Sequence, residues 1–262
     1  MGKTYAGNSS GVAKVPKKIY AGNGSNVAKA VKVVYCGNSS GKAVEVWRNS
    51  TLPSTYQKVE YIFNSGGTQY IDTGIVANSD TKSSLDVQFT GSDVPQFYFF
   101  GVEYTAPNEG TKDYCMLVSS NNPRKIYIYF GGGVTLDSNE EAVYVNTRYK
   151  FIFNDSGGKF YKNNKLLGTS TTTFSKPGNN IPLLLFGYNH VWGGTGGYNT
   201  TIAKEGLRVY RFQAWQSNVL IRDMYPCYLK SNTQTVGMYD LVNGQFYGNS
   251  GTGIFYKGPN ID

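Results

Sequence analysis

The chain contains a single histidine, His190, inside a segment rich in aromatic and amide side chains. A serine nucleophile would need this histidine as its base, but the sequence has no Gly-x-Ser-x-Gly turn to hold such a serine. Sugar rings present apolar C–H faces and hydroxyl edges, which aromatic platforms and amide or hydroxyl donors can bind. The Gly-rich loop expected at Gly187–Tyr198 supplies these groups, and the candidate glycan-binding residues are Tyr188, Asn189, His190, Trp192, Tyr198 and Asn199.

The same segment has a second interpretation. A large aromatic side chain between glycines often covers an apolar edge, so Trp192 and Tyr198 could close one end of a fold or pack against a neighbouring subunit. Another aromatic loop, expected from Tyr104 to Tyr114, is a further candidate of the same kind. The residue types leave both interpretations open.

Metal chemistry finds little support in the spacing of the ligating residues. Neither the histidine nor the cysteines have a zinc-ligand spacing, and we expect no cofactor. Five scattered oxygen ligands could contribute to a calcium site, but no Asp-x-Asp-x-Asp cluster supports one, and surface turns are the default interpretation of these residues. Those ligands would be Asp72, Asp86, Asp93, Asn108 and Asp113. The cysteines are an odd three, Cys36, Cys115 and Cys227, and we expect them to be small buried apolar residues.

The sequence predicts that the elements that position these residues are β-strands. From Tyr56 onward, more than ten short runs rich in β-branched and aromatic residues are separated by Gly, Asn and Ser clusters, and no convincing amphipathic helix interrupts them. In Gly206–Trp215, apolar residues alternate with Arg208, Arg211 and Gln213, as in a strand with one buried face and one solvent-exposed face. The run Leu183–Phe186 is apolar on both faces, so we expect it inside the fold. Together these patterns predict an all-β, antiparallel two-sheet sandwich.

A tandem repeat precedes this region. Tyr5, Tyr20 and Tyr35 open three units with a period of fifteen, each containing Tyr-x-Gly-Asn. The units predict turns followed by strands, hence a small N-terminal β-meander that needs a partner to be stable. We therefore assign residues 1–50 to anchoring and assembly, with self-association expected, and residues 51–262 to the sandwich. The polar, Pro-containing stretch at Arg48–Ser54 suits a linker.

The positive charge is concentrated in the repeats. Eight Lys and Arg residues against Glu45 give residues 1–50 a net charge of +7, which leaves +1 of the total of +8 for the rest of the chain. A polyanion-binding arm is one interpretation. Because the lysine positions vary between units whereas the Tyr, Gly, Asn and Ala positions repeat, we favour solvated strand faces and do not expect nucleic acid as a partner.

Several segments after residue 51 resemble the concanavalin A-like lectin/glucanase (laminin-G-like) jelly-roll domains of proteins from Firmicutes phages and prophages. The opening is carried by residues 52–62 (LPSTYQKVEYI) and 67–74 (GTQYIDTG), and a hairpin by Lys159–Leu166, with Asn164 where a glycine is usual. Residues 207–227 resemble the penultimate strand with its return, and residues 236–253 the closing hairpin. The resemblance covers about residues 52–259 and implies a jelly roll. The Tyr-x-Gly-Asn repeats likewise resemble repeats that precede such domains.

The resemblance implies a virion protein of the tail or another exposed appendage, made in the bacterial host cytoplasm. Glucanases of this fold carry Glu-x-Asp-x-x-Glu on one strand, which is absent here, and the adjacent Glu140 and Glu141 would point to opposite faces. We therefore expect a non-enzymatic protein that attaches to other virion proteins and displays the jelly roll to host cell-surface polysaccharide. A decoration protein without a ligand, a free bacterial carbohydrate-binding module and a hydrolase with unrecognised acids remain alternatives. The sequence predicts neither a signal peptide nor a membrane span.

Overall fold

The computed structural model describes most of residues 51–261 and, in the N-terminal region, only the backbone of four short strands. Within 51–261 the described residues exclude 92–93, 95, 107–109, 121–122, 133–140, 156, 173, 176–179, 193–198 and 205, together with the side chains of Ala106 and Trp192. The chain divides into two compact units, Met1–Thr51 and Leu52–Asp262. Among the described residues, no helix is long and apolar enough to cross a membrane.

The described strands of the first unit form two separate antiparallel hairpins. Strand β1 (Tyr20–Gly22) pairs with β2 (Ala28–Ala30), and β3 (Val33–Gly37) pairs with β4 (Ala43–Arg48). The two strands of each pair flank the Gly-Asn segment of one repeat unit, most of which lies outside the described residues. The expected single meander is therefore replaced, in the described residues, by one hairpin around each of the last two repeat turns. Tyr20 and Tyr35 lie on β1 and β3, whereas Tyr5 lies outside the described residues.

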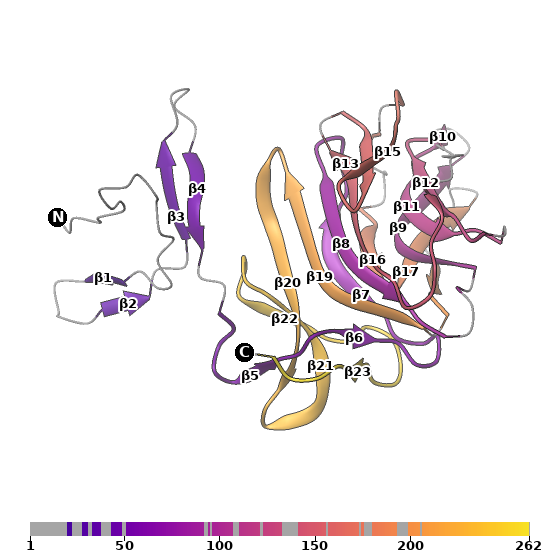
Figure 1. The fold of residues 1–262 in the computed structure, drawn as a ribbon. Coiled ribbons are helices and arrows are strands. Elements are labelled where there is room, and N and C mark those ends of the chain that lie inside the picture. The colour runs from indigo at the N-terminus through magenta and orange to yellow at the C-terminus, as the bar shows by residue number, and fades with distance from the viewer. Residues whose placement is uncertain are drawn as a thin grey trace. The chain divides into compact units, whose positions relative to one another are not determined.

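The second unit is an all-β sandwich of two curled sheets, as predicted (Figure 1). The larger sheet has the strand order β15-β14-β13-β8-β19-β20-β21-β22, and β5, β6 and β23 attach to it. Its strands are β5 (Tyr56–Lys58), β6 (Ile62–Phe63), β8 (Lys82–Phe89), β13 (Arg148–Asp155), β14 (Lys159–Lys162), β15 (Lys165–Thr169), β19 (Leu207–Gln216), β20 (Val219–Leu229), β21 (Asn232–Asp240), β22 (Gln245–Tyr247) and β23 (Tyr256–Lys257).

The smaller sheet has the order β12-β11-β9-β16-β7, with β10, β17 and β18 attached. Its strands are β7 (Ile71–Val76), β9 (Phe97–Ala106), β10 (Gly110–Thr111), β11 (Tyr114–Val118), β12 (Ile126–Phe130), β16 (Pro182–Leu185), β17 (Gly187–Trp192) and β18 (Asn199–Ile202). One pairing departs from the antiparallel prediction. After β16 runs antiparallel to β9, the chain reverses at Phe186, whose φ is +64°, and β17 runs parallel to β9.

The core between the sheets is dominated by aromatic rings. Phe99, Phe100, Phe153 and Phe212 are fully buried, and the ring of Phe153 lies 4.2 Å from that of Tyr114 between centroids. The run Leu183–Phe186 is buried throughout, as the sequence predicted. Burying each of these large side chains contributes about 2–3 kcal/mol from the removal of apolar surface from water. The sandwich thus has one main hydrophobic core, and a smaller separate cluster forms around Cys227, Tyr239 and Leu241.

Strand β19 confirms the predicted alternation, with one irregularity. Leu207, Val209 and Phe212 are buried in the core, whereas Arg208 and Arg211 face outward. The register to β8 shifts between Val209 and Arg211, which is the mark of a β-bulge. The bulge brings Tyr210 to the outer face, where the Arg148 guanidinium lies 3.8 Å from its ring centroid.

Both ends of the sandwich unit meet at strand β5. This strand pairs with β20, and the ring of Tyr56 packs on those of Tyr239 and Phe246, with centroids 4.9 and 5.4 Å apart. The C-terminal segment lies beside it, because Ile261 N–H donates to the carbonyl of Lys58 over 3.1 Å. The first and last residues of the unit are therefore held at one place on the larger sheet.

Candidate ligand-binding face

The segment predicted as a glycan-binding loop is a strand for half its length. Gly187–Trp192 forms β17, because it pairs with β9 on one edge and β18 on the other. Tyr188, Asn189 and His190 are 3%, 1% and 7% exposed. Asn199 opens β18 and is exposed. Tyr198 and the side chain of Trp192 lie outside the described residues.

Asn189 differs in role from its neighbours on β17. Its Nδ2 donates to the carbonyl of Pro182 over 2.9 Å, and its Oδ1 accepts from the Thr200 hydroxyl over 2.7 Å. Both interactions lie within the protein and hold β17 against the end of β16 and against β18. The side chain of Asn189 therefore positions β16, β17 and β18.

Tyr188 and His190 lie on the outer face of the smaller sheet, together with side chains of β9. In the parallel register His190 is paired with Glu103, so the two side chains share a face. The ring of Tyr188 stacks on that of Tyr98, with centroids 3.8 Å apart, and lies 5.2 Å from the imidazole of His190. Tyr129 of β12 is 6.5 Å from Tyr98.

Strand β11 adds a second carboxyl group to this face. Tyr114 pairs with Val102, so the preceding Asp113 lies beside Glu103 on the neighbouring strand. Asp113 is only 3% exposed. Burial, and secondly the charge of Glu103, raise the pKa of Asp113 to about 7, although the N–H of Tyr104 partly opposes the change by donating to Oδ1. We call Tyr98, Glu103, Asp113, Tyr129, Tyr188 and His190 the tyrosine–acid face.

The tyrosines and the histidine of this face are neutral near pH 7. Burial, followed by the charge of Glu103, raises the pKa of Tyr188 to about 12 and that of Tyr98 still further. Burial lowers the pKa of His190, whose Nε2 is 3.1 Å from the Thr201 hydroxyl. The face therefore presents phenol and imidazole groups beside carboxyl oxygens. One of these oxygens, Glu103 Oε2, is buried without a hydrogen-bond partner among the described residues.

Gly101 permits the close approach of β9 and β11 beneath the face. Its φ is +119°, and a Cβ atom there would lie 2.1 Å from the carbonyl oxygen of Tyr114 and 2.5 Å from the Cα of Cys115. Only glycine avoids both contacts and tolerates this backbone conformation. Cys115 is buried, and burial raises the pKa of its thiol well above the ordinary value, so the thiol is unreactive in the folded protein.

Sequence reasoning missed the contribution of Tyr98, Glu103, Asp113 and Tyr129 to one site. The expected loop from Tyr104 to Tyr114 is instead the end of β9, the short β10 and the start of β11. A hairpin across this segment would have placed Glu103 opposite Asp113, and the Pro/Asn-containing turn between them was the available signal. Tyr98 was hidden within the aromatic run Phe97–Phe100, where no alternation is visible.

The burial of the carboxyl groups limits what a ligand can contact on this face. Asp113 carries a pKa suited to proton transfer, but its carboxyl group is almost fully enclosed, so a substrate cannot reach it directly. Nor do any three His, Cys, Asp or Glu side chains in the described part of the chain come together in a way that could hold a metal ion. What remains accessible is an aromatic surface with polar edges, formed by the partly buried Tyr98, Tyr129 and Glu103.

No protein-family model matches the sequence, and comparison with curated proteins and with solved structures gives no match.

Proposed function

We propose that this chain is a non-enzymatic phage virion protein whose sandwich binds host-surface glycan through the tyrosine–acid face. The observation that carries the proposal is the Tyr98–Tyr188 stack beside Glu103, with ring centroids 3.8 Å apart. A stacked pair of this kind holds an aromatic surface in a fixed orientation, which lowers the entropy lost when a sugar ring packs on it. The virion assignment rests on the resemblance of residues 52–259 and of the preceding repeats.

Polar groups around the stack match the hydroxyl edges of a sugar. Glu103 is partly exposed, and a sugar hydroxyl could donate to its Oε1, because Oε2 is itself buried without a hydrogen-bond partner among the described residues. Thr201 and Asn199 are exposed along β18 at the edge of the face and offer further donors and acceptors. The neutral phenols can donate, because their pKa values are raised. The face thus combines the two kinds of contact that a sugar requires.

The N-terminal repeats complete the proposal by joining the sandwich to the particle. A single small glycan site binds weakly, whereas many copies displayed on one particle convert weak binding into strong attachment. The repeat hairpins are too small to be stable alone, so we propose that other virion proteins, or further copies of this chain, complete them.

The test is binding of the full-length chain to an array of bacterial cell-wall polysaccharides. Tyr98→Ala removes half of the stack and should abolish binding. Tyr144→Ala is the matched control, because Tyr144 is 58% exposed and lies outside the tyrosine–acid face. If the parent protein binds no polysaccharide on the array, or if Tyr144→Ala is as damaging as Tyr98→Ala, glycan recognition by this face is wrong.

A second candidate function is supported by the burial of Tyr188 and His190. Both side chains are more than nine-tenths buried, as expected for residues that pack within a purely structural decoration protein. The two functions differ in what Tyr98→Ala does to particles. A structural role requires fewer copies of the variant per particle in electron micrographs, whereas a receptor role leaves the copy number unchanged and reduces adsorption to cells.

A further inference from the structure

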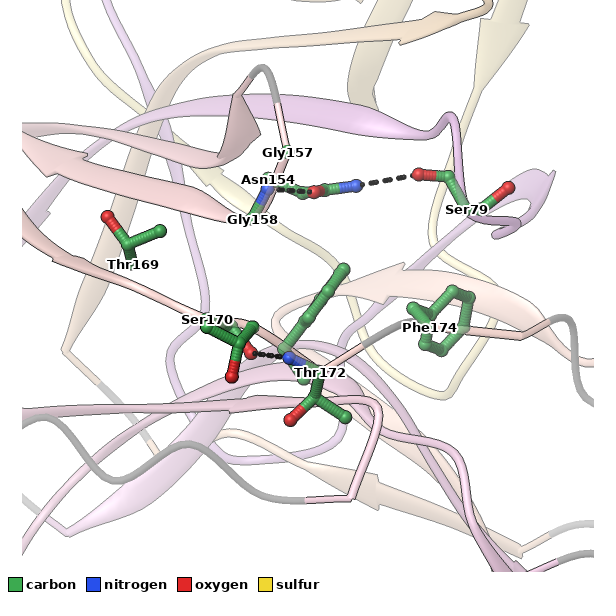
Figure 2. A pocket seen from close by; sticks show the side chains of 10 residues that line it. Ser79, Asn154, Gly157, Gly158, Thr169, Ser170, Thr172 and Phe174 are labelled. Atoms are coloured by element: carbon green, nitrogen blue, oxygen red, sulfur yellow. Dashed lines mark hydrogen bonds between the residues drawn. The ribbon is translucent and has the colours of Figure 1, made fainter.

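A hollow of about 380 Å³ lies where turns of the sandwich meet, and Figure 2 shows the side chains that line it. None of the described residues that line it belongs to the tyrosine–acid face. The turn after β7 contributes Ser79, the β13–β14 turn contributes Gly157 and Gly158, and the stretch after β15 contributes Thr171 and Thr172. These segments are far apart in the sequence and come together only because β8, β13, β14 and β15 are neighbours in the larger sheet. The volume lies at the lower end of the range for small-molecule sites, which suits a single sugar residue rather than a polymer segment.

The walls of the hollow are held in place by hydrogen bonds. Asn154 Nδ2 donates to the carbonyl of Ser79 over 3.1 Å, and Asn154 Oδ1 accepts from Gly158 N–H over 3.1 Å (Figure 2). Asn154 Nδ2 also donates to the carbonyl of Thr81 over 2.7 Å. Gly158 and Ser170 pair through their backbones, and a Cβ on Gly158 would lie 2.5 Å from the Ser170 carbonyl oxygen. The site is therefore formed before any ligand arrives, which reduces the cost of ordering it.

The floor of the hollow is aromatic and continuous with the core. Phe130 and Phe174 line it, and their ring centroids are 5.6 Å apart. Phe130 also contacts Phe160, and Phe174 contacts Tyr114, with centroids 5.6 and 5.5 Å apart. These contacts fix the rings, so the base of the hollow is a rigid apolar surface against which C–H groups can pack.

The rim has a different chemistry from the floor. Hydroxyl groups of Ser79, Thr169, Thr171 and Thr172 surround the opening, and all four residues are exposed. Among the residues that the structure describes, no charged side chain lines the hollow. A charged ligand would lose its hydration without gaining a partner of opposite charge, and such desolvation is costly. A wholly apolar ligand would leave the rim hydroxyls without partners. The combination favours a compact, neutral molecule with several hydroxyl groups.

We propose that this hollow is a second ligand site, which binds one neutral sugar residue. It is independent of the proposed function, because it shares no residue with the tyrosine–acid face. The two sites lie on opposite sides of β12: Tyr129 belongs to the face and the next residue, Phe130, to the floor of the hollow. Because both are sugar sites in our proposals, each must be tested separately.

The experiment is a titration of the isotope-labelled full-length chain, followed by the amide shifts of Gly157, Gly158 and Thr171. The probes are glucose, galactose and N-acetylglucosamine, with glucuronate as the charged comparison. We expect dissociation constants on the order of 1–10 mM for at least one neutral sugar. The double variant Thr169→Val and Thr171→Val keeps the side-chain shape but removes two hydroxyls, which should weaken binding by about tenfold or more. Thr233→Val, on an exposed position of β21, should leave binding unchanged.

The outcomes separate the two sites. If the amide shifts are confined to Gly101 and its neighbours, the proposal that the hollow binds sugar is wrong. The same result would support sugar binding at the tyrosine–acid face. The proposal is also overturned if no neutral sugar shifts the amides of the hollow at about 50 mM, well above the expected dissociation constant, or if glucuronate binds as tightly as glucose. Should the double variant lose its native spectrum, Ser79→Ala removes one rim hydroxyl from a different turn and carries the same expectation of weaker binding.

Discussion

Asp113→Asn should remove a large pH dependence from the stability of the sandwich. In the folded protein the pKa of Asp113 is about 7, against an ordinary value of 3.8, because the carboxyl is buried beside Glu103. The protonated form is therefore the one that the fold accommodates. The stabilising contribution of this group is fully present below pH 4 and is lost as the pH rises toward 7.

The magnitude follows from the two pKa values. A difference of about three pH units, at 1.36 kcal/mol for each, gives an upper estimate of about 4 kcal/mol for the loss of stability between pH 4 and pH 8. Asparagine has nearly the shape of protonated aspartate and can donate to Glu103. The variant should thus match the parent near pH 4 and exceed its unfolding free energy by up to about 4 kcal/mol at pH 8.

The assay is urea unfolding of the full-length chain at several pH values, with the variant-minus-parent difference plotted against pH. Taking this difference cancels the titration of the other carboxyl groups. Asp80→Asn, which changes an exposed turn, is the control and should give a difference that varies by less than about 0.5 kcal/mol. A carbon-13 titration that places the Asp113 carboxyl below pH 5, or parallel stability profiles for variant and parent, would refute the reasoning. Glu103→Gln should lower the pKa of Asp113, since that charge is its second cause.

Three further predictions concern packing and turns. Gly101→Ala should destabilise the sandwich by at least about 3 kcal/mol, measured by urea unfolding, because its Cβ would clash with β11 at a positive φ. Gly66→Ala, where a Cβ meets nothing within 4 Å, should change stability by less than about 0.5 kcal/mol, and equal effects would contradict the argument. Asn164 has a φ of +67° in the β14–β15 turn. Asn164→Ala should therefore cost about 1 kcal/mol while Asn164→Gly costs almost nothing, and similar losses in thermal unfolding for both would show that the turn does not require this geometry. Cys115 and Cys227 are buried, so a thiol reagent should label them only after unfolding, and peptide mass spectrometry showing rapid native labelling would be inconsistent with their burial.

The strands of the sandwich could be predicted from the sequence where the local pattern of apolar and polar residues reflects burial. Alternation in β19 and the continuous apolar run at Leu183–Phe186 both reflect burial on one or two faces, which the residue types record directly. The strand β17 was not predictable in the same way. Its parallel pairing depends on a positive φ at Phe186, a conformation that local rules assign to glycine or asparagine and that only the surrounding core can impose on phenylalanine.

Only the residues of the candidate site that are neighbours in the sequence could be predicted from the sequence. Tyr188 and His190 stood out as an unusual local cluster, and both do lie on the tyrosine–acid face. Glu103 and Asp113 come from different strands and meet only through the register of β9 with β11. Tyr98 reaches the face because the β9 register shifts opposite Met116 and Leu117, which breaks the alternation that a sequence reader would follow.

The junction at β5 has a mechanical consequence. A pull transmitted along the chain from residue 51 reaches Leu52, which packs against the cluster around Tyr239, and then the carbonyl of Thr55, which accepts from Lys230 N–H over 3.0 Å. The ring of Tyr56, which contacts those of Tyr239 and Phe246, and the pairing of β5 with β20 come next. The C-terminal segment is bonded to the same strand at Lys58 and Val59, so it resists the peeling of β5 as well. If the chain tethers a particle to a host surface, as we propose above, this junction would bear the load before the core does. Its rupture force, rather than the stability of the whole sandwich, would then set how long the tether holds.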